Sequence, residues 1–196
     1  GDRLKLLSID QWGTNKWKNM RSAFAGAENM DVKATDTPDL SQTTDLSWMF
    51  IGNKSLKGES ANWNWNTSTI TKMSGVFQNA NQFNQNIGSW DVSKVTDTAA
   101  MFNGASAFNN GGSDSIANWN TSNLVIANDM FRKAASFNQP IGSWDMKKVQ
   151  FLVRFLSDAT SFNQSLAAWR LDSLVILPGK PLSGAAAALD HTAISR

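Results

Sequence analysis

Residues 83–109, FNQNIGSWDVSKVTDTAAMFNGASAFN, contain one complete copy of a pattern that recurs along the chain. A tryptophan returns every 25 to 29 residues, and a large apolar residue lies twelve positions after the first four of these tryptophans. Two columns that keep one register indicate tandem repeats, and their period falls in the range of leucine-rich repeats. The tryptophans are Trp65, Trp90, Trp119, Trp144 and Trp169, and the apolar residues are Phe77, Phe102, Phe131 and Leu156.

The repeats predict an α/β fold, namely a right-handed solenoid of the leucine-rich-repeat type with about six coils and capping ends. Residues 83–87 are expected to form a short strand, so that equivalent strands build a parallel sheet. Residues 96–105 are expected to form a short helical or 3-10 turn that begins at Thr96. Between these two segments, the side chain of Asp91 is expected to hydrogen-bond to its own backbone in a tight turn, as are Asn66 and Asn120.

The whole chain of 196 residues is predicted to form a single domain, because it is long enough for a sizeable core and the repeats show no break. Residues 1–30 are assigned to an N-terminal cap and degenerate coil, with a strand at 5–9 and a helix at 17–27. Residues 31–174 hold the repeat coils. Residues 175–196 are assigned to a C-terminal cap or tail.

Composition argues against catalysis. The chain has no cysteine and one histidine, His191, and it contains no glycine-rich phosphate loop or metal-spaced cluster. The loop at 109–115 has oxygen ligands and glycines but lacks the alternating aspartates of a strong calcium site. We therefore expect no enzyme activity, cofactor or metal.

Charge and hydropathy limit the classes of partner and the cellular locations that are compatible with the sequence. A net charge of +2 is too small to indicate a specific nucleic-acid partner. No apolar run is long enough to cross a membrane, and the first residues lack the layout of a signal peptide, which fits an excised or mature fragment.

The motif W-D-x-S-x-V-T-x-x-x-x-M-F-x-x-A-x-x-F-N-Q, spread over residues 12–174, resembles the repeat of BspA-like leucine-rich-repeat surface proteins of bacteria. This resemblance implies a non-enzymatic adhesion module that is extracellular or held at the bacterial cell surface. Its partner would be a protein or glycan of a host or neighbouring cell, recognised through the solenoid face and edge loops.

An asparagine follows the phenylalanine of each FN pair, so that these residues are expected to form a row across the repeats. Two interpretations remain open. The amides can bridge backbone groups of adjacent coils, or they can form a polar recognition strip for glycan hydroxyls or a protein. The members of this asparagine row are Asn84, Asn109, Asn138 and Asn163.

The five tryptophans in register are expected to lie in the core, with each indole N–H bonded to a turn carbonyl. Trp48 and Trp63 lie outside this column. We expect these two side chains to be exposed, and they are the aromatic candidates for stacking on a ligand.

Five basic residues are concentrated in two consecutive repeats and are expected to form a basic patch. An alternative function is therefore the binding of anionic polymers, and a further alternative is that of a structural spacer in a larger surface protein. The basic residues are Arg132, Lys133, Lys147, Lys148 and Arg154.

Overall fold

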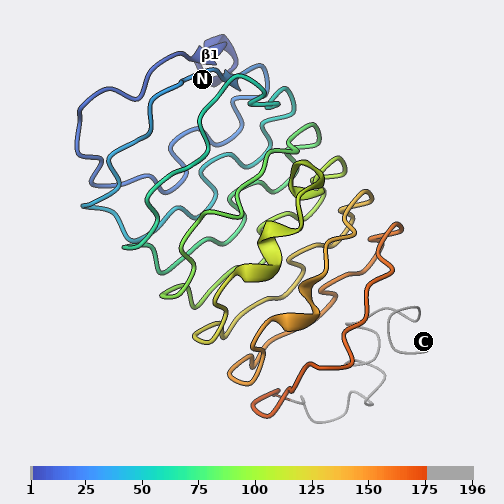
Figure 1. The fold of residues 1–196 in the computed structure, drawn as a ribbon. Coiled ribbons are helices and arrows are strands. Elements are labelled where there is room, and N and C mark those ends of the chain that lie inside the picture. Colours follow the sequence, from blue (N-terminus) through green and yellow to red (C-terminus); the bar gives the residue numbers. More distant parts are fainter. Residues whose placement is uncertain (1, 176–196) are drawn as a thin grey trace.

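The computed structural model describes residues 2–175, in which successive repeats lie side by side along one axis (Figure 1). Most of these residues are in turns and irregular segments. Two short strands, β1 (Ser8–Ile9) and β2 (Asp31–Val32), form a parallel pair. The helical segments in this part of the chain are all of the 3-10 type. They are η1 (Asp2–Lys5), η2 (Asn110–Gly112), η3 (Asp114–Asn118) and η4 (Ile141–Ser143).

The predicted α/β solenoid of about six coils is wrong. Across residues 2–175 there is no α-helix, and β1 and β2 are the only strands, so that the chain is mostly irregular. Residues 83–87 form no strand, and residues 96–105 contain turns instead of a helical segment.

The N-terminal cap also differs from its prediction. The helix expected at residues 17–27 is replaced by irregular backbone at 17–20 and turns at 21–26, and the strand expected at 5–9 is limited to β1. The predicted C-terminal cap lies outside the described residues from residue 176 onward.

Left-handed backbone explains why no helix forms. In residues 46–53, overlapping turns are closed by N–H···O bonds of 3.1 to 3.3 Å, and Trp48 and Gly52 have φ angles of 59° and 72°. A left-handed residue other than glycine costs about 1–2 kcal/mol and cannot continue a right-handed helix. The same two positions are left-handed in each repeat. They are Ser22, Trp48, Gly75, Ala100, Asp129 and Arg154, and then Gly26, Gly52, Asn79, Gly104, Lys133 and Asp158.

These turn segments are joined by backbone hydrogen bonds that we call the amide ladder. The N–H groups of Leu46, Trp48, Phe50 and Gly52 donate to carbonyls of residues 72–78, at 2.7 to 3.0 Å. The same four bonds recur from 73–79 to 97–103, from 98–104 to 126–132, and from 127–133 to 151–157. Every bond of the ladder runs from an earlier repeat to a later one.

Amide side chains provide the connection at residues 83–87, where a strand was expected. The N–H of Ile87 donates to Oδ1 of Asn110 at 2.9 Å, and the N–H of Asn109 donates to Oδ1 of Asn84 at 2.7 Å. Because side-chain oxygens take the place of backbone carbonyls, the repeats approach each other here without forming a sheet.

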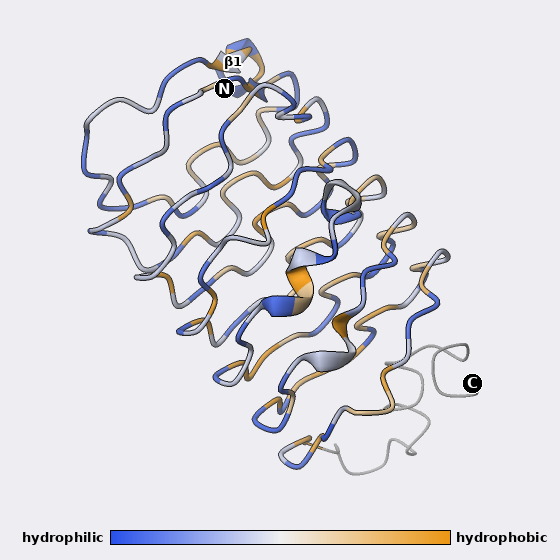
Figure 2. Cartoon of the chain, viewed as in Figure 1, coloured by the Kyte–Doolittle hydropathy of each residue, from blue (hydrophilic) through white to orange (hydrophobic). Residues whose placement is uncertain are grey.

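Aromatic columns fill the space between these segments, and hydrophobic stretches recur at corresponding places in successive loops (Figure 2). Nearly parallel rings of the first column have centroids 5.4 to 5.7 Å apart, and those of the second are 5.9 to 6.1 Å apart. Stacked, fully desolvated rings contribute burial energy and favourable ring contacts. The columns contain Phe50, Phe77, Phe102 and Phe131, and Phe83, Phe108, Phe137 and Phe162.

One buried polar residue interrupts this core. Asn53 is fully buried, and neither its Oδ1 nor its Nδ2 has a hydrogen-bond partner within residues 2–175. The other repeats place alanine at this position. These alanines are Ala27, Ala80, Ala105, Ala134 and Ala159.

Replacing Asn53 by alanine is therefore expected to stabilise the protein, by about 1–3 kcal/mol, because an unsatisfied buried amide is removed. Asn110→Ala is the matched control: Asn110 is equally buried, but its amide accepts from Ile87 and donates to the carbonyl of Ser113 at 2.7 Å. Urea unfolding should show opposite signs for the two variants. A loss of stability in Asn53→Ala would contradict the absence of partners at Asn53.

Candidate functional site

The asparagine row bridges adjacent repeats. The Oδ1 atoms of Asn84, Asn109 and Asn138 accept the backbone N–H groups of Asn109, Asn138 and Asn163 at 2.7, 2.9 and 2.8 Å. The interpretation that these amides link successive repeats is confirmed. The ligand-binding role of the row stays a prediction.

Further donors complete the bonding of these oxygens. Asn84 Oδ1 also accepts the N–H of Gly111 at 3.0 Å, and the Nε2 groups of Gln139 and Gln164 reach Asn109 and Asn138 at 2.9 and 3.1 Å. These glutamines were not predicted as part of the row, although the recurring FNQ triplet was the available signal.

The amide nitrogens of the asparagine row, in contrast to the oxygens, lack hydrogen-bond partners among the described residues. Within residues 2–175, the Nδ2 atoms of Asn84, Asn109, Asn138 and Asn163 have no hydrogen-bond acceptor. The first three side chains are partly buried and Asn163 is exposed. The row therefore presents three amide donors whose orientation is fixed by a bond to the next repeat, on Asn84, Asn109 and Asn138.

Asp31 occupies the corresponding position in an earlier repeat, and it too was missed in the sequence. Its Oδ1 accepts the N–H groups of Lys57 and Gly58 at 2.9 and 2.8 Å. A carboxylate thus makes the same bridge as the asparagine Oδ1 atoms, although it brings no N–H donor.

The prediction that Trp63 is exposed is wrong. Its side chain is buried, its Nε1 donates to the carbonyl of Gly58 at 3.0 Å, and its ring lies 5.0 Å from that of Phe83. Trp63 lies two positions before Trp65, outside the tryptophan register, and yet both indoles face the core. The indole of Trp63 is covered by packed residues instead of being open to a ligand.

Trp48 is partly buried, and other residues of the chain contact its ring. The guanidinium of Arg21 lies 4.5 Å from the centroid of its ring, a distance that favours cation–π attraction. A Cβ atom on Gly75 would lie 2.4 Å from its Cδ1. The ring therefore packs between Arg21 of the preceding repeat and Gly75 of the following one. Both contacts are internal to the fold, and the proposed stacking of Trp48 on a ligand stays a prediction.

Gly75→Ala is expected to displace Trp48 and to destabilise the protein, because the new Cβ meets the indole and because φ at this residue is +60°. Gly112→Ala is the control for backbone strain alone, since φ there is +79° and nothing lies within 4 Å of the new Cβ. Thermal unfolding should give a lower midpoint for Gly75→Ala than for Gly112→Ala. Equal losses would show that the indole contact is unimportant.

The predicted core position is confirmed for Trp65, Trp90, Trp119 and Trp144, whereas Trp169 is partly buried. The indoles of Trp90, Trp144 and Trp169 donate to carbonyls of the preceding repeat at 2.8, 3.0 and 2.9 Å, and Trp65 donates to Asn62 at 2.9 Å. Trp119 differs, because its buried Nε1 has no partner within residues 2–175. The extra residues that precede Trp119, including η2 and η3, account for this interruption.

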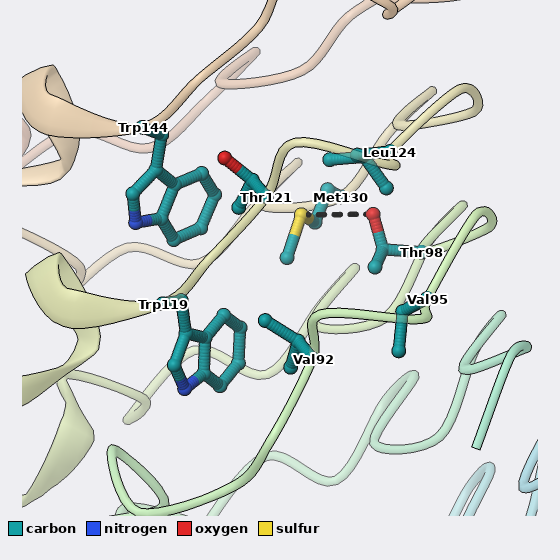
Figure 3. Close-up of a pocket in the computed structure, with 8 residues that line it drawn as sticks. All are labelled: Val92, Val95, Thr98, Trp119, Thr121, Leu124, Met130 and Trp144. Atoms are coloured by element: carbon teal, nitrogen blue, oxygen red, sulfur yellow. Dashed lines mark hydrogen bonds between the residues drawn. The ribbon is translucent and has the colours of Figure 1, made fainter. Parts of the chain in front are cut away.

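A pocket lies beside Trp119 (Figure 3). Its lining is almost entirely apolar, and its two threonine hydroxyls already donate to backbone carbonyls: Thr98 to Ile126 at 3.3 Å and Thr121 to Asp145 at 3.0 Å. We interpret it as a packing gap caused by the interrupted column. Its lining residues are Val92, Val95, Thr98, Trp119, Thr121, Leu124, Met130 and Trp144.

The predicted basic patch is divided and partly neutralised. Arg154 makes two bonds to the carboxylate of Asp129, at 2.8 and 3.0 Å, and this carboxylate raises the pKa of Arg154. Arg132 lies 3.9 Å from the same carboxylate. Lys133 is exposed.

Lys147 and Lys148 have partners other than Asp129. Lys147 lies 4.0 Å from the carboxylate of Asp145, and Lys148 Nζ donates to Oδ1 of Asn123 at 2.8 Å. The structure therefore links Arg132 with Arg154 but gives Lys147 and Lys148 separate partners.

The turn chemistry expected at Asp91, Asn66 and Asn120 is confirmed. The Oδ1 atoms of Asp91, Asn66 and Asn120 accept the N–H of the residue two positions later at 2.9, 3.2 and 3.2 Å. Hydrogen bonds from the side chain and backbone of Ser93 lower the pKa of Asp91.

Asp91→Asn should keep this turn, because asparagine fills the position in two other repeats, and stability at pH 7 should change by only about 0.5 kcal/mol. A carboxylate with a lowered pKa contributes stability above its unfolded pKa, and this contribution is lost as the pH falls through the folded pKa. The variant should therefore lose less stability than the wild type on acidification below about pH 4. Identical acid unfolding curves would show that Asp91 does not contribute.

Comparisons with known proteins give one family. Residues 18–115 and 112–179 match a family described as "Mycoplasma protein of unknown function, DUF285". The chain belongs to this family. Its two consecutive matches to DUF285 cover most of the repeats. No curated protein and no solved structure matches the chain.

The described part of this DUF285 chain contains no group of three or more histidine, cysteine, aspartate or glutamate residues that could hold a metal ion. Over the same residues, no helix has the length and hydrophobicity needed to span a membrane. His191 lies outside the described residues.

Proposed function

We propose that this chain is a non-enzymatic binding module of the bacterial cell surface, which recognises a protein or glycan through the asparagine row. The observation that carries the proposal is the set of Nδ2 donors without an acceptor in residues 2–175. The resemblance of the repeat motif to BspA-like surface proteins supports an extracellular location and an adhesive role.

The row is suited to an extended partner because its donors are fixed in advance. Each Oδ1 that bonds to the next repeat holds its amide plane, so little side-chain freedom is lost when the Nδ2 meets an acceptor. The phenylalanines that precede the asparagines are stacked 5.9 to 6.1 Å apart, which gives the approximate spacing of the donors. Glycan hydroxyls and peptide carbonyls are acceptors that such a series can meet in succession.

The anionic-polymer alternative has weaker support. Arg132 and Arg154 share Asp129, and Lys147 lies near Asp145, so two carboxylates offset part of the five positive charges of the basic group. Exposed pairs of this kind also leave little field beyond the Debye length at physiological salt. Four members of the basic group are exposed, which favours this alternative: Lys133, Lys147, Lys148 and Arg154.

The test removes the Nδ2 donors of the asparagine row and keeps the Oδ1 acceptors that link successive repeats. In Asn84→Asp/Asn138→Asp, each carboxylate retains an acceptor for the next repeat, as Asp31 does, but the Nδ2 groups are lost. Binding is measured on arrays of glycans and host-matrix proteins, with urea unfolding to verify the fold. We expect binding to weaken roughly ten- to hundredfold, since two hydrogen bonds are lost.

The control variant, Lys147→Ser/Lys148→Ser/Arg154→Ser, changes the basic group alone. Binding through the asparagine row should persist in this variant and at high salt. Binding that fades with salt and with these substitutions would identify the anionic-polymer function instead. Binding that neither set of changes affects, or no binding to any array component, would contradict both functions and favour the spacer.

A further inference from the structure

The FNQ triplets join amide side chains across the boundary between repeats. Nε2 of Gln139 donates to Oδ1 of Asn109 at 2.9 Å, and Nε2 of Gln164 donates to Oδ1 of Asn138 at 3.1 Å. Each bond uses the oxygen of the asparagine and the nitrogen of the glutamine. Each amide pair therefore keeps one N–H donor, the Nδ2 of its asparagine, and one acceptor, the Oε1 of its glutamine.

These remaining groups reach the surface of the molecule. Within residues 2–175, the Nδ2 atoms of Asn109 and Asn138 and the Oε1 atoms of Gln139 and Gln164 make no hydrogen bond. None of them belongs to the side-chain atoms that are both sealed from solvent and without a partner. Those atoms lie in Trp12, Trp17, Asn53, Trp119 and Arg132. The two amide pairs therefore offer donors and acceptors to an outside molecule.

On their inner side, the amide pairs already bind polypeptide backbone. Oδ1 of Asn109 accepts the backbone N–H of Asn138 at 2.9 Å, and Nε2 of Gln139 donates to the backbone carbonyl of Asn109 at 2.9 Å. A side-chain amide carries the same donor and acceptor as a peptide group. The outer ends of the pairs are therefore complementary to a second stretch of backbone.

The surroundings of the amide pairs favour peptide over sugar. Sugar rings are commonly held by an aromatic face in addition to hydrogen bonds. Among residues 2–175, the exposed aromatic side chain is that of Phe151, which pairs with Ile126 outside the FNQ triplets, whereas Phe137 and Phe162 beside the amide pairs are buried. A site that offers amide hydrogen bonds without an aromatic face suits a partner that is itself rich in amide groups.

The step between repeats approaches that of an extended strand. The rings of Phe108 and Phe137 lie 6.1 Å apart and those of Phe137 and Phe162 lie 5.9 Å apart, which approximates the step between the asparagines that follow them. Along one edge of a strand, an N–H and a carbonyl recur every two residues, at about 6.4 to 6.8 Å, and the rise is shorter in a strongly twisted strand. Consecutive amide pairs can therefore meet alternate residues of one strand.

We propose that the asparagine row binds an extended polypeptide segment along one backbone edge, through the pairs Asn109–Gln139 and Asn138–Gln164. Carbonyls of the segment accept from the Nδ2 groups, and its N–H groups donate to the Oε1 groups. This inference rests on the proposed function and selects peptide backbone as the chemistry of the partner. Because the contacts are made to backbone, recognition depends little on the side chains of the segment.

The probe is an eight-residue peptide of alternating threonine and valine with a lysine at each end, titrated into the ¹⁵N-labelled full chain. We expect the side-chain NH₂ signals of Asn109 and Asn138 to shift in NMR spectra. Three N-methyl groups on alternate residues block one edge of the peptide and leave the other free, so this peptide should bind as the parent does. Three N-methyl groups on consecutive residues obstruct both edges and should weaken binding at least about tenfold.

Variants of the protein locate the contact. Asn138→Asp keeps an acceptor for the next repeat and loses Nδ2, whereas Gln164→Leu loses Oε1, and each should weaken peptide binding roughly tenfold. Asn66→Asp is the matched control, because Asn66 is exposed outside the asparagine row and Asp91 fills the same position in the next repeat. This control should bind as the wild type does, and urea unfolding verifies the fold of each variant.

The outcomes separate this inference from the proposed function. Peptide binding that survives the consecutive methyl groups, or that Asn138→Asp leaves unchanged, would overturn the inference, as would a lack of peptide binding at millimolar concentration. Glycan binding that is lost in Asn84→Asp/Asn138→Asp would in that case assign the asparagine row to a sugar and leave the proposed function standing. A chain that binds neither the peptide nor any array component would contradict both.

Discussion

The amide ladder is the constraint on which the rest of the structure depends. Alternate N–H groups in each turn segment leave the segment and bond to the next repeat, while intervening N–H groups close turns within it. This division of donors requires left-handed residues at two fixed positions, and several of these are not glycine, such as Ala100, Asp129 and Arg154. The backbone strain at these positions is offset by bonds on which the neighbouring repeat also depends.

Side chains follow the register that the ladder imposes. Because equivalent residues are brought together, phenylalanine stacks on phenylalanine and each asparagine bonds to the backbone of the next asparagine. A residue that departs from the repeat pattern therefore leaves groups without partners at the interface with the neighbouring repeats. Two examples are Asn53, which lacks partners in a column of alanines, and Trp119, whose indole is left unpaired after the extra residues of η2 and η3.

The sequence was sufficient for the period, the buried columns and the turns after Trp65, Trp90 and Trp119, because these depend on residue type and spacing. It was misleading for secondary structure. Residues 17–27 have apolar residues at helical spacing, but Ser22 and Gly26 are left-handed, and a serine gives no advance sign of this. For the candidate site, the asparagine row was predicted, whereas the paired carboxylates beside Arg132, Arg154 and Lys147 depend on contacts that the sequence does not show.

The single direction of the ladder also has an electrical consequence. Each peptide unit carries a dipole, and units that point the same way add together, as they do in an α-helix. Here the carbonyls point toward the N-terminal end and the N–H groups toward the C-terminal end, so the negative pole lies at the first repeat. Two basic side chains lie near that pole: Arg21 belongs to the first turn segment, and the guanidinium of Arg3 lies beside Gly26. Lys133 and Arg154 belong to the last turn segments, near the opposite pole. The ladder thus has a polarity opposite to that of an α-helix, and the chain carries cations near both of its poles.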